Sequence, residues 1–326
     1  MNLMNERALY YGKGAVFAYR TYVKPLLGVR RIPESSFSGR SNIVFGLNAK
    51  VSVGGSAFLP SFTEGDNSMV VATDSMKNFI QRHLASYEGS TIEGFIAYVA
   101  KSFLEKYPQM ETVKIIGEEL PFNGAKASSS VESDLVFSRS LNESSEAMIE
   151  MVRTENGAMI NNHSSSIKKL QLIKVHGNSF VGFIRDEYTT LPEDSNRPLF
   201  VYLNINWKYE NVTDSYGEDP YHYVAAEQIR DIATSVFHEM ETPSIQNLIY
   251  LIGCRILERF PQLTEVNFES QNHTWETVVD EIPGTKSKVY TEPRPPYGFQ
   301  VFSILREDVD KDKPTGTIVE NSSQGS

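Results

Sequence analysis

The sequence contains an internal repeat, and this repeat constrains the fold more than any other feature. When the 326-residue chain is shifted by 153 positions, residue 91 falls on residue 244, and three segments match their counterparts without a gap. The matched segments are Val71–Asp74 with Val224–Glu227, Thr91–Glu93 with Ser244–Gln246, and Phe103–Gln109 with Ile256–Gln262. A chain of this length accommodates about two domains of about 150 residues each. The repeat therefore predicts two halves built on one plan.

Hydrophobic periodicity predicts the same order of elements in each half. The predicted helices are Asp74–Tyr87 and Glu93–Tyr107 in the first half, and Glu227–His238 and Gln246–Phe260 in the second. The predicted strands are Tyr10–Val23, Ile43–Val53, Thr112–Ile116, Asp134–Arg139, Leu170–Leu191, Leu199–Lys208, Glu265–Glu269 and Gly298–Leu305. Each half thus follows the order strand, strand, helix, helix, strand, strand. The expected class is α+β, with antiparallel sheets that carry a helix pair on one face.

Polar segments separate the predicted elements. Asn123–Ser133 and Asn161–Ser166 are rich in Ser and Asn and favour loops, and we expect the boundary between the halves between about residues 150 and 168. We predict one domain over residues 8–150, a second over residues 168–305, and a disordered tail over residues 306–326. A sheet with both helices on one face leaves its other face bare, so a second copy of the chain is expected to cover it.

Charge and composition exclude several classes of partner. The chain has 31 Lys and Arg against 41 Asp and Glu, a net charge of −10, so nucleic acid and anionic membranes are poor partners. Its single cysteine, Cys254, allows no internal disulfide and indicates a reducing compartment. No apolar run reaches the roughly 18 residues of a membrane span, and the stretch from Met1 to Tyr10 is too polar for a signal peptide. We expect a cytoplasmic protein.

Metal and cofactor motifs do not occur in the sequence. The six histidines form no H-E-x-x-H or H-x-H pair, and one cysteine cannot make a zinc cluster. A Ser nucleophile elbow, a Walker loop and a G-x-G-x-x-G fingerprint are also absent. Enzymes that depend on a metal or an organic cofactor therefore lose most of their support.

Reactive side chains stand at positions where the two repeats differ. Thr73 and Asp74 open the first predicted helix, where the second half has Ala226 and Glu227. The ordinary interpretation is a helix start, with Thr as the cap and Asp complementing the helix dipole. Lys13 lies between two glycines. It is either a solvated loop lysine or, in a partly desolvated cleft, a base that works near neutral pH.

The second half offers groups that suit a flat anion. Arg197 follows an acidic stretch and is either an ion-pair partner or a forked donor for a planar anion. Phe180 is either a core residue or a ring that presents its face to a flat ligand. Ser244, Ile245 and Gln246 open a predicted helix, with Ser244 as an ordinary N-cap. Periodicity alone does not decide between these alternatives.

Several strings of the sequence are similar to those of one protein family. They are Tyr11-Gly12-Lys13-Gly14, Val71-Ala72-Thr73-Asp74-Ser75-Met76-Lys77-Asn78, Asn178-Ser179-Phe180-Val181-Gly182-Phe183-Ile184-Arg185-Asp186-Glu187-Tyr188-Thr189-Thr190-Leu191, Ser244-Ile245-Gln246 and Gln271-Asn272-His273. On these strings the chain resembles the urate oxidase (uricase) family, in its bacterial, bacillus-like form, from about Tyr10 to Leu305.

The resemblance implies a fold, an assembly and a reaction. It implies two tandem tunnelling-fold (T-fold) domains that assemble into barrels in a homotetramer, with active sites at subunit interfaces. It also implies the oxidation of urate by dioxygen and water to 5-hydroxyisourate and hydrogen peroxide, a step of purine catabolism, without a metal or an organic cofactor. The implied partners are urate, dioxygen and further copies of the chain, with no role for nucleic acid or a membrane.

The resemblance also implies roles for individual residues. In the second half, Arg197 and Gln246 resemble the clamp on the edge of the purine, with the backbone of Ile245 beside it. Phe180 resembles the ring that stacks on the substrate.

The remaining roles implied by the resemblance concern proton transfer and oxygen. Thr73 and Asp74 match a pair that reaches in from the neighbouring subunit. Lys13 and Thr73 match a proton-relay dyad. Asn272 matches the side chain that faces the oxygen site.

One departure from the family pattern concerns the relay histidine. In fungal and animal members it stands two residues after the asparagine, whereas here His273 follows Asn272 directly and Thr274 takes the expected place. Three alternatives follow. The loop shifts so that His273 serves, or Gln271 occupies the asparagine position, or the relay runs without a histidine.

The competing hypothesis comes from another functional class. A catalytically inactive purine- or pterin-binding T-fold oligomer would retain Phe180, Arg197 and Gln246 but would tolerate the loss of Lys13 or Thr73, and both are present. Pterin-making enzymes of the same architecture require zinc-type histidines, which this sequence does not offer.

Overall fold

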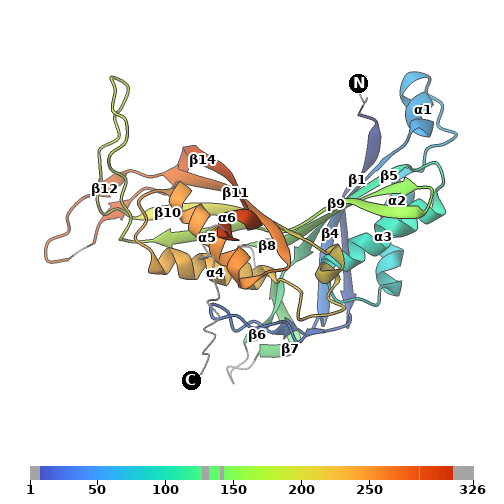
Figure 1. Cartoon of the computed structure of the whole chain (residues 1–326), viewed down its shortest axis with the longest axis horizontal. Coiled ribbons are helices and arrows are strands. Elements are labelled where there is room, and N and C mark those ends of the chain that lie inside the picture. Colours follow the sequence, from blue (N-terminus) through green and yellow to red (C-terminus); the bar gives the residue numbers. More distant parts are fainter. Residues whose placement is uncertain (1–7, 127–131, 140–142, 286, 311–326) are drawn as a thin grey trace, which may run out of the picture.

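The fold is built on one long antiparallel sheet. The computed structural model describes residues 8–126, 132–139, 143–285 and 287–310, and in it eight strands pair in the order β1-β4-β5-β8-β9-β10-β11-β14. Their bounds are β1 Tyr10–Thr21, β4 Val44–Gly54, β5 Thr112–Leu120, β8 Ser144–Thr154, β9 Gly157–Lys174, β10 Leu199–Tyr209, β11 Leu263–Thr274 and β14 Arg294–Leu305. Four strands come from each half, and the pairing of β8 with β9 joins the halves at the middle of the sheet (Figure 1).

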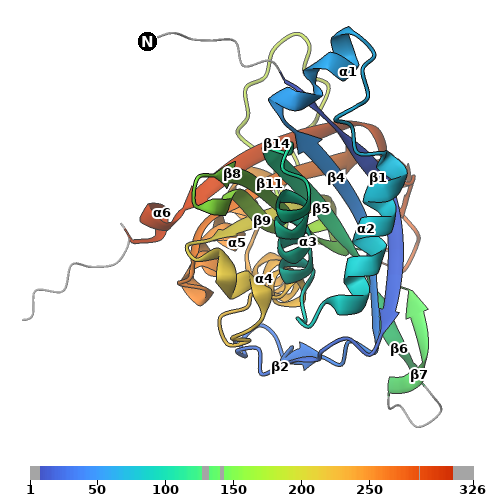
Figure 2. The same ribbon diagram turned by 90° about the vertical axis from the view of Figure 1, so that its right-hand side faces the viewer.

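Two helix pairs cover the sheet, one pair on each half (Figures 1 and 2). They are α2 Thr73–Ser86 and α3 Ile92–Lys106, then α4 Ala226–Glu239 and α5 Ile245–Arg259. The four predicted helices are confirmed to within one or two residues. The chain is thus a mixed α+β protein with a large antiparallel sheet. The division into two domains at residues 150–168 stays a prediction; the turn between β8 and β9 lies at residues 155–156.

Short elements complete the described chain. They are β2 Leu26–Leu27, β3 Gly39–Arg40, β6 Phe122–Lys126, β7 Glu132–Arg139, β12 Thr277–Val279, β13 Val289–Tyr290, the 3-10 helices η1 Ser56–Phe58 and η2 Val212–Tyr216, and the helices α1 Leu59–Thr63 and α6 Arg306–Asp310. None of the helices described is both long and apolar enough to cross a bilayer.

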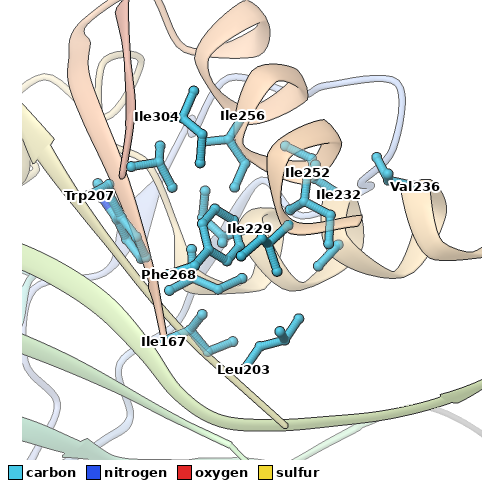
Figure 3. Packing of buried hydrophobic residues seen from close by; sticks show 14 of the residues in the cluster. Ile167, Leu203, Trp207, Ile229, Ile232, Val236, Ile252, Ile256, Phe268 and Ile304 are labelled. Carbon is cyan, nitrogen blue, oxygen red and sulfur yellow. The ribbon is translucent and has the colours of Figure 1, made fainter. Parts of the chain in front are cut away.

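Each half packs its own apolar core between the sheet and its helices. In β10, every second residue is buried, from Leu199 to Tyr209, and these side chains meet the inner faces of α4 and α5. Figure 3 shows Trp207 and Phe268 from the sheet against Ile229 and Ile256 from the helices. A separate cluster fills the first half. The helices therefore hold their starts in fixed positions over the ends of the strands.

Two strand predictions and two loop predictions need correction. Asp134–Arg139 lies in β7, which among the described strands pairs with β6 in a small hairpin, and the fourth strand of the first half is β8. The polar segment Asn161–Ser166 is not a loop but part of β9. Within the polar segment Asn123–Ser133, residues 123–126 belong to β6 and residues 132–133 to β7. The strand predicted for Leu170–Leu191 ends at Lys174, because Gly177 and Gly182 adopt positive φ (79° and 73°) and turn the chain away from the sheet.

The expected tail begins later than predicted. Residues 306–310 form helix α6, and Val309 is buried against the second core. Residues 311–326 lie outside the described part of the chain.

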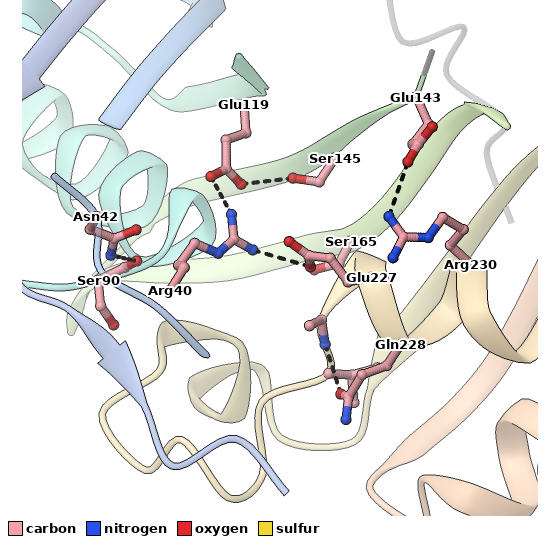
Figure 4. A network of polar contacts seen from close by, with 12 residues as sticks. Arg40, Asn42, Ser90, Glu119, Glu143, Ser145, Ser165, Glu227, Gln228 and Arg230 are labelled. Atoms are coloured by element: carbon pink, nitrogen blue, oxygen red, sulfur yellow. Dashed lines mark hydrogen bonds and ion pairs between the residues drawn. The ribbon is translucent and has the colours of Figure 1, made fainter. Parts of the chain in front are cut away.

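A polar network fills the junction between the halves (Figure 4). Arg40 pairs with Glu119 and, at 3.5 Å, with Glu227 at the start of α4. Arg230 of α4 pairs with Glu143 at 3.1 Å. The start of α4 is therefore occupied by contacts with the first half.

Candidate active site

Lys13 lies on an irregular stretch of β1. The β1–β4 register shifts between Lys13 and Val16, and Ala15 adopts a φ of 54°, so the strand bulges directly after the lysine. A Cβ at Gly12 would lie 1.8 Å from the carbonyl oxygen of Val51, so only glycine fits there. The bulge and the close approach fix the direction of the half-buried Lys13 side chain.

Thr73 and Asp74 form the start of α2, beside Lys13. The N-cap of this helix is Ala72, which provides no side-chain cap, so the interpretation of Thr73 as a capping residue does not hold. Asp74 accepts from Nζ of Lys77 (2.6 Å), and this bond, assisted by the nearby charge of Lys13, lowers the pKa of Asp74. Lys13, Thr73 and Asp74 thus gather at one end of the first half.

Phe180 and Arg197 lie together in the second half, in the long loop between β9 and β10. The guanidinium carbon of Arg197 lies 5.3 Å from the centroid of the Phe180 ring. Burial lowers the pKa of Arg197, with the charge of Asp194 opposing the shift, and a guanidinium stays charged at neutral pH. Nε of Arg197 is buried and has no hydrogen-bond partner among the described residues. The Phe180 ring also stacks on the Phe183 ring of the same loop, with 4.7 Å between centroids. An aromatic ring and a guanidinium fork are groups that suit a planar anion.

Asn178 and Thr242 hold this loop against the start of α5, and the sequence analysis assigned them no role. Nδ2 of Asn178 donates to the carbonyls of Lys174 (3.1 Å) and Arg197 (3.0 Å). The backbone N–H of Ser179 donates to the carbonyl of Thr242 (2.9 Å). The sequence signal was an asparagine beside a glycine after a predicted strand, which is typical of a side chain that bonds its own loop backbone.

Ile245 and Gln246 open α5 close to that loop. Ser244 is the N-cap, as predicted, and its hydroxyl accepts from the backbone N–H of Asn247 (3.2 Å). Ile245 is buried, whereas the Gln246 side chain is exposed. The clamp residues expected in the second half therefore share one end of it.

Asn272 and His273 lie at the end of β11 and, by strand alternation, point to opposite faces of the sheet. Asn272 shares its side with the buried Ser270 and Phe268, the side that the helices cover. The His273 ring stacks on Tyr297 (4.8 Å between centroids), and its Nε2 lies 3.4 Å from Oε1 of Gln271. The role of His273 in a relay stays a prediction, and the Thr274 side chain lies outside the part of the chain that the structure describes.

The structure gathers the predicted residues into two groups, not one. Lys13, Thr73 and Asp74 belong to the first half, whereas Phe180, Arg197, Ile245 and Gln246 belong to the second. Asp74 and Gln246 are both exposed within one chain. Each group is therefore half of a candidate site.

Comparison with known proteins identifies relatives of this fold. The fold defines a duplicated α+β protein with one continuous antiparallel sheet and a candidate site divided between its halves. The chain is similar to a crystal structure of urate oxidase from Bacillus sp. TB-90, with a TM-score of 0.89, 68% identity, and coverage of 91% of this chain and 100% of that one.

Sequence relatives identify the family. The model of the family described as Uricase matches residues 163–301. A uricase from Haloferax volcanii is 50% identical over 92% of this chain and 99% of its own length. The chain belongs to the uricase family.

A further relative is longer than this chain. The uric acid degradation bifunctional protein of Bacillus subtilis (strain 168) is 66% identical over 94% of this chain, which spans only 63% of that protein's length.

Proposed function

We propose that the chain is a urate oxidase, which oxidises urate with dioxygen and water to 5-hydroxyisourate and hydrogen peroxide without a cofactor. The observation that carries this proposal is the pairing of Phe180 with Arg197, whose buried Nε has no hydrogen-bond partner in the part of the chain that the structure describes. An unpaired buried donor beside an aromatic face suits a flat anion, and membership of the uricase family supports urate as that anion.

The proposed chemistry requires the removal of a second proton. Urate is already an anion at neutral pH, and its reaction with dioxygen needs a more electron-rich form. Lys13 and Thr73 take this proton, directly or through water, and Asp74 lies beside them. Arg197 stabilises the negative charge that spreads over the ring, and Gln246 with the backbone of Ile245 orients the purine edge. Asn272 faces the oxygen, and His273 is a further relay candidate.

The internal contact between the halves supports a site shared by two chains. Within one chain, the start of α4 meets the first half beside the start of α3. Arg40 pairs there with Glu227, and the hydroxyl of Thr91, the N-cap of α3, donates to the carbonyl of Ser215 (3.0 Å). The loop that carries Arg40 also bonds to the start of α3, because Nδ2 of Asn42 donates to the carbonyl of Ser90 (2.9 Å).

By the internal repeat, α2 corresponds to α4 and α3 corresponds to α5. The same kind of contact between two chains would bring Thr73 and Asp74 of one chain against Ile245 and Gln246 of another. Closed symmetric assemblies repeat such contacts. We propose that the halves are tandem T-fold domains and that the chains form a homotetramer with sites at the interfaces.

One assay tests the reaction and its alternatives. The protein is incubated with urate and dioxygen in the presence of EDTA, and the fall in ultraviolet absorbance of urate is compared with the peroxide released. We expect one peroxide for each urate consumed, with no effect of EDTA. Absence of turnover would favour a catalytically inactive purine-binding oligomer, and turnover abolished by EDTA would indicate a metal enzyme.

A further inference from the structure

The Tyr11 hydroxyl joins the two segments that carry Lys13 and Thr73. It accepts a hydrogen bond from the backbone N–H of Val71 (2.8 Å) and donates one to the carbonyl of Val71 (3.1 Å). Tyr11 stands two residues before Lys13 on β1, and Val71 stands two residues before Thr73 at the start of α2. One side chain therefore fixes both segments at the end where the dyad lies.

The surroundings of Tyr11 hold its ring in place. The ring meets the buried ring of Phe58 edge-on, with 5.1 Å between centroids and an interplanar angle of 86°. Burial raises the pKa of Tyr11, so its hydroxyl keeps the proton that it donates. The other side-chain bonds between β1 and α2 involve Gln81 with Phe17, and Arg20 with Leu84, further along both elements.

The pairing of β1 with β4 makes this bond important for Lys13. Tyr11 and Lys13 pair in register with Val53 and Val51, and the register shifts only after Lys13, so the ladder holds the two residues together. The ladder joins β1 to β4 and does not itself set the distance from β1 to the start of α2. The Tyr11 hydroxyl supplies the missing tie, across a gap that no backbone bond closes among the residues described.

The second half contains the same tie without a dyad. Tyr209 accepts from the N–H of Val224 (3.0 Å) and donates to its carbonyl (3.4 Å), and Val224 is the repeat counterpart of Val71. Tyr209 comes from the end of β10, however, and the helix start that it holds carries Ala226. A tyrosine hydroxyl thus supports the start of a helix in both halves. In the first half this tyrosine also belongs to β1, the strand that carries Lys13, whereas Tyr209 belongs to β10.

We propose that Tyr11 is a positioning residue that sets the separation between Lys13 and Thr73 for proton transfer. This inference rests on the proposed urate oxidation. Tyr11 acts through the backbone and touches neither the substrate nor the reacting atoms. Its loss should therefore slow the proton-transfer step and leave substrate binding almost unchanged.

The test compares Tyr11→Phe with Tyr209→Phe and the unchanged protein in urate turnover. Tyr11→Phe should lower kcat between about 10-fold and 100-fold, since small misplacements of reacting groups cost this much. KM should stay within about twofold, and the acid limb of the kcat profile against pH should move by at least about half a unit. Tyr209→Phe should lower the melting temperature but leave kcat and its pH profile as they were.

Two results would overturn the positioning role: equal kcat and pH profiles in Tyr11→Phe and the unchanged protein, or an equal loss of kcat in Tyr209→Phe. If Tyr11→Phe does not fold, Phe58→Leu, which frees the ring to move, replaces it with the same expected split between kcat and KM. The turnover of the unchanged protein is measured first. If it consumes no urate, the proposed function is refuted before any variant is compared.

Discussion

The starts of α2 and α4 are repeat counterparts, yet their surroundings differ completely. At α4, Ala226 and Glu227 face the first half of their own chain, where Arg40 pairs with Glu227. At α2, Thr73 and Asp74 make no hydrogen bond or ion pair with the second half among the described residues, and the Asp74 side chain is 70% exposed. One of the two corresponding helix starts is thus part of an internal junction, and the other presents an exposed polar group.

The halves remain alike in the bonds that hold their helices. Arg153 and Arg306, 153 positions apart, each donate to three carbonyls around the end of a helix. The acceptors are Leu104, Tyr107 and Met110 in the first half and Leu257, Phe260 and Leu263 in the second. Duplication preserved the supports of the fold, while the helix starts diverged.

The largest expected difference between the halves concerns their lysines. Lys13→Met should lower kcat by between about 10²-fold and 10⁴-fold, the usual contribution of a general base. Lys168→Met is the matched control, because Lys168 lies in the corresponding bulge of β9, directly before Lys169 with its φ of 60°. Steady-state urate turnover measures both, and equal losses would remove the functional distinction between the halves.

Glu93, the repeat counterpart of Gln246, should make stability depend on pH. Burial raises the pKa of Glu93 to about 7, opposed by a hydrogen bond from Ser165. Between about pH 4.5 and 7 the folded state holds a proton that the unfolded chain releases, so the free energy of unfolding falls as pH rises through this window.

Glu93→Gln should abolish that slope and stabilise the protein above pH 7 by roughly 3 kcal/mol. Thermal or urea unfolding across this pH range measures the effect. Glu105→Gln, on the exposed side of α3, is the control and should leave the slope in place. A slope that survives in Glu93→Gln would mean that another group takes up the proton.

Arg153→Gln and Arg306→Gln should each destabilise the fold by about 2 kcal/mol. Each substitution removes a charged donor, and several carbonyl oxygens at a helix end then lose their hydrogen bond. The two losses should be similar, since the two sets of acceptors correspond through the repeat. Arg82→Gln on the exposed face of α2 is the control. Urea midpoints measure all three, and a loss confined to one half would show that the correspondence is only geometric.

The N-caps offer the smallest test. Ser244→Ala should cost about 1 kcal/mol, the usual value of such a cap. Thr91→Ala should cost about 1 kcal/mol more, because Thr91 also donates to the carbonyl of Ser215 across the junction between the halves. Urea unfolding of both variants and of the unchanged protein measures the two losses of stability. Equal losses would mean that the bond from Thr91 to the carbonyl of Ser215 adds nothing to stability.

The helices and most strands could be predicted from the sequence, because their apolar residues recur with a regular period and face one core. The strand β9 did not, because Ser165 and Ser166 are polar yet buried at the junction, where Ser165 bonds to Glu93 and Ser166 to the carbonyl of Glu146. Polar residues with polar partners from distant segments look like a loop in the sequence alone.

The candidate site was predictable only in its parts. The repeat pointed to Thr73 and Asp74, and Lys13 was a candidate because it lies between two glycines. Phe180 and Arg197 were open alternatives from the sequence, and the family resemblance favoured their binding roles. Tyr11 and Asn178 escaped notice because their partners are backbone groups, and backbone groups have no signature in a sequence. The sequence alone assigned the two groups to different halves, but the strand order was needed to show that both halves belong to one continuous sheet.

In the proposed assembly, the occupied junction between α4 and the first half sets a stoichiometry. Each chain uses one of its two corresponding helix starts in its own internal junction, so the other remains for a neighbouring chain. We therefore expect such an assembly to saturate at one planar anion per chain.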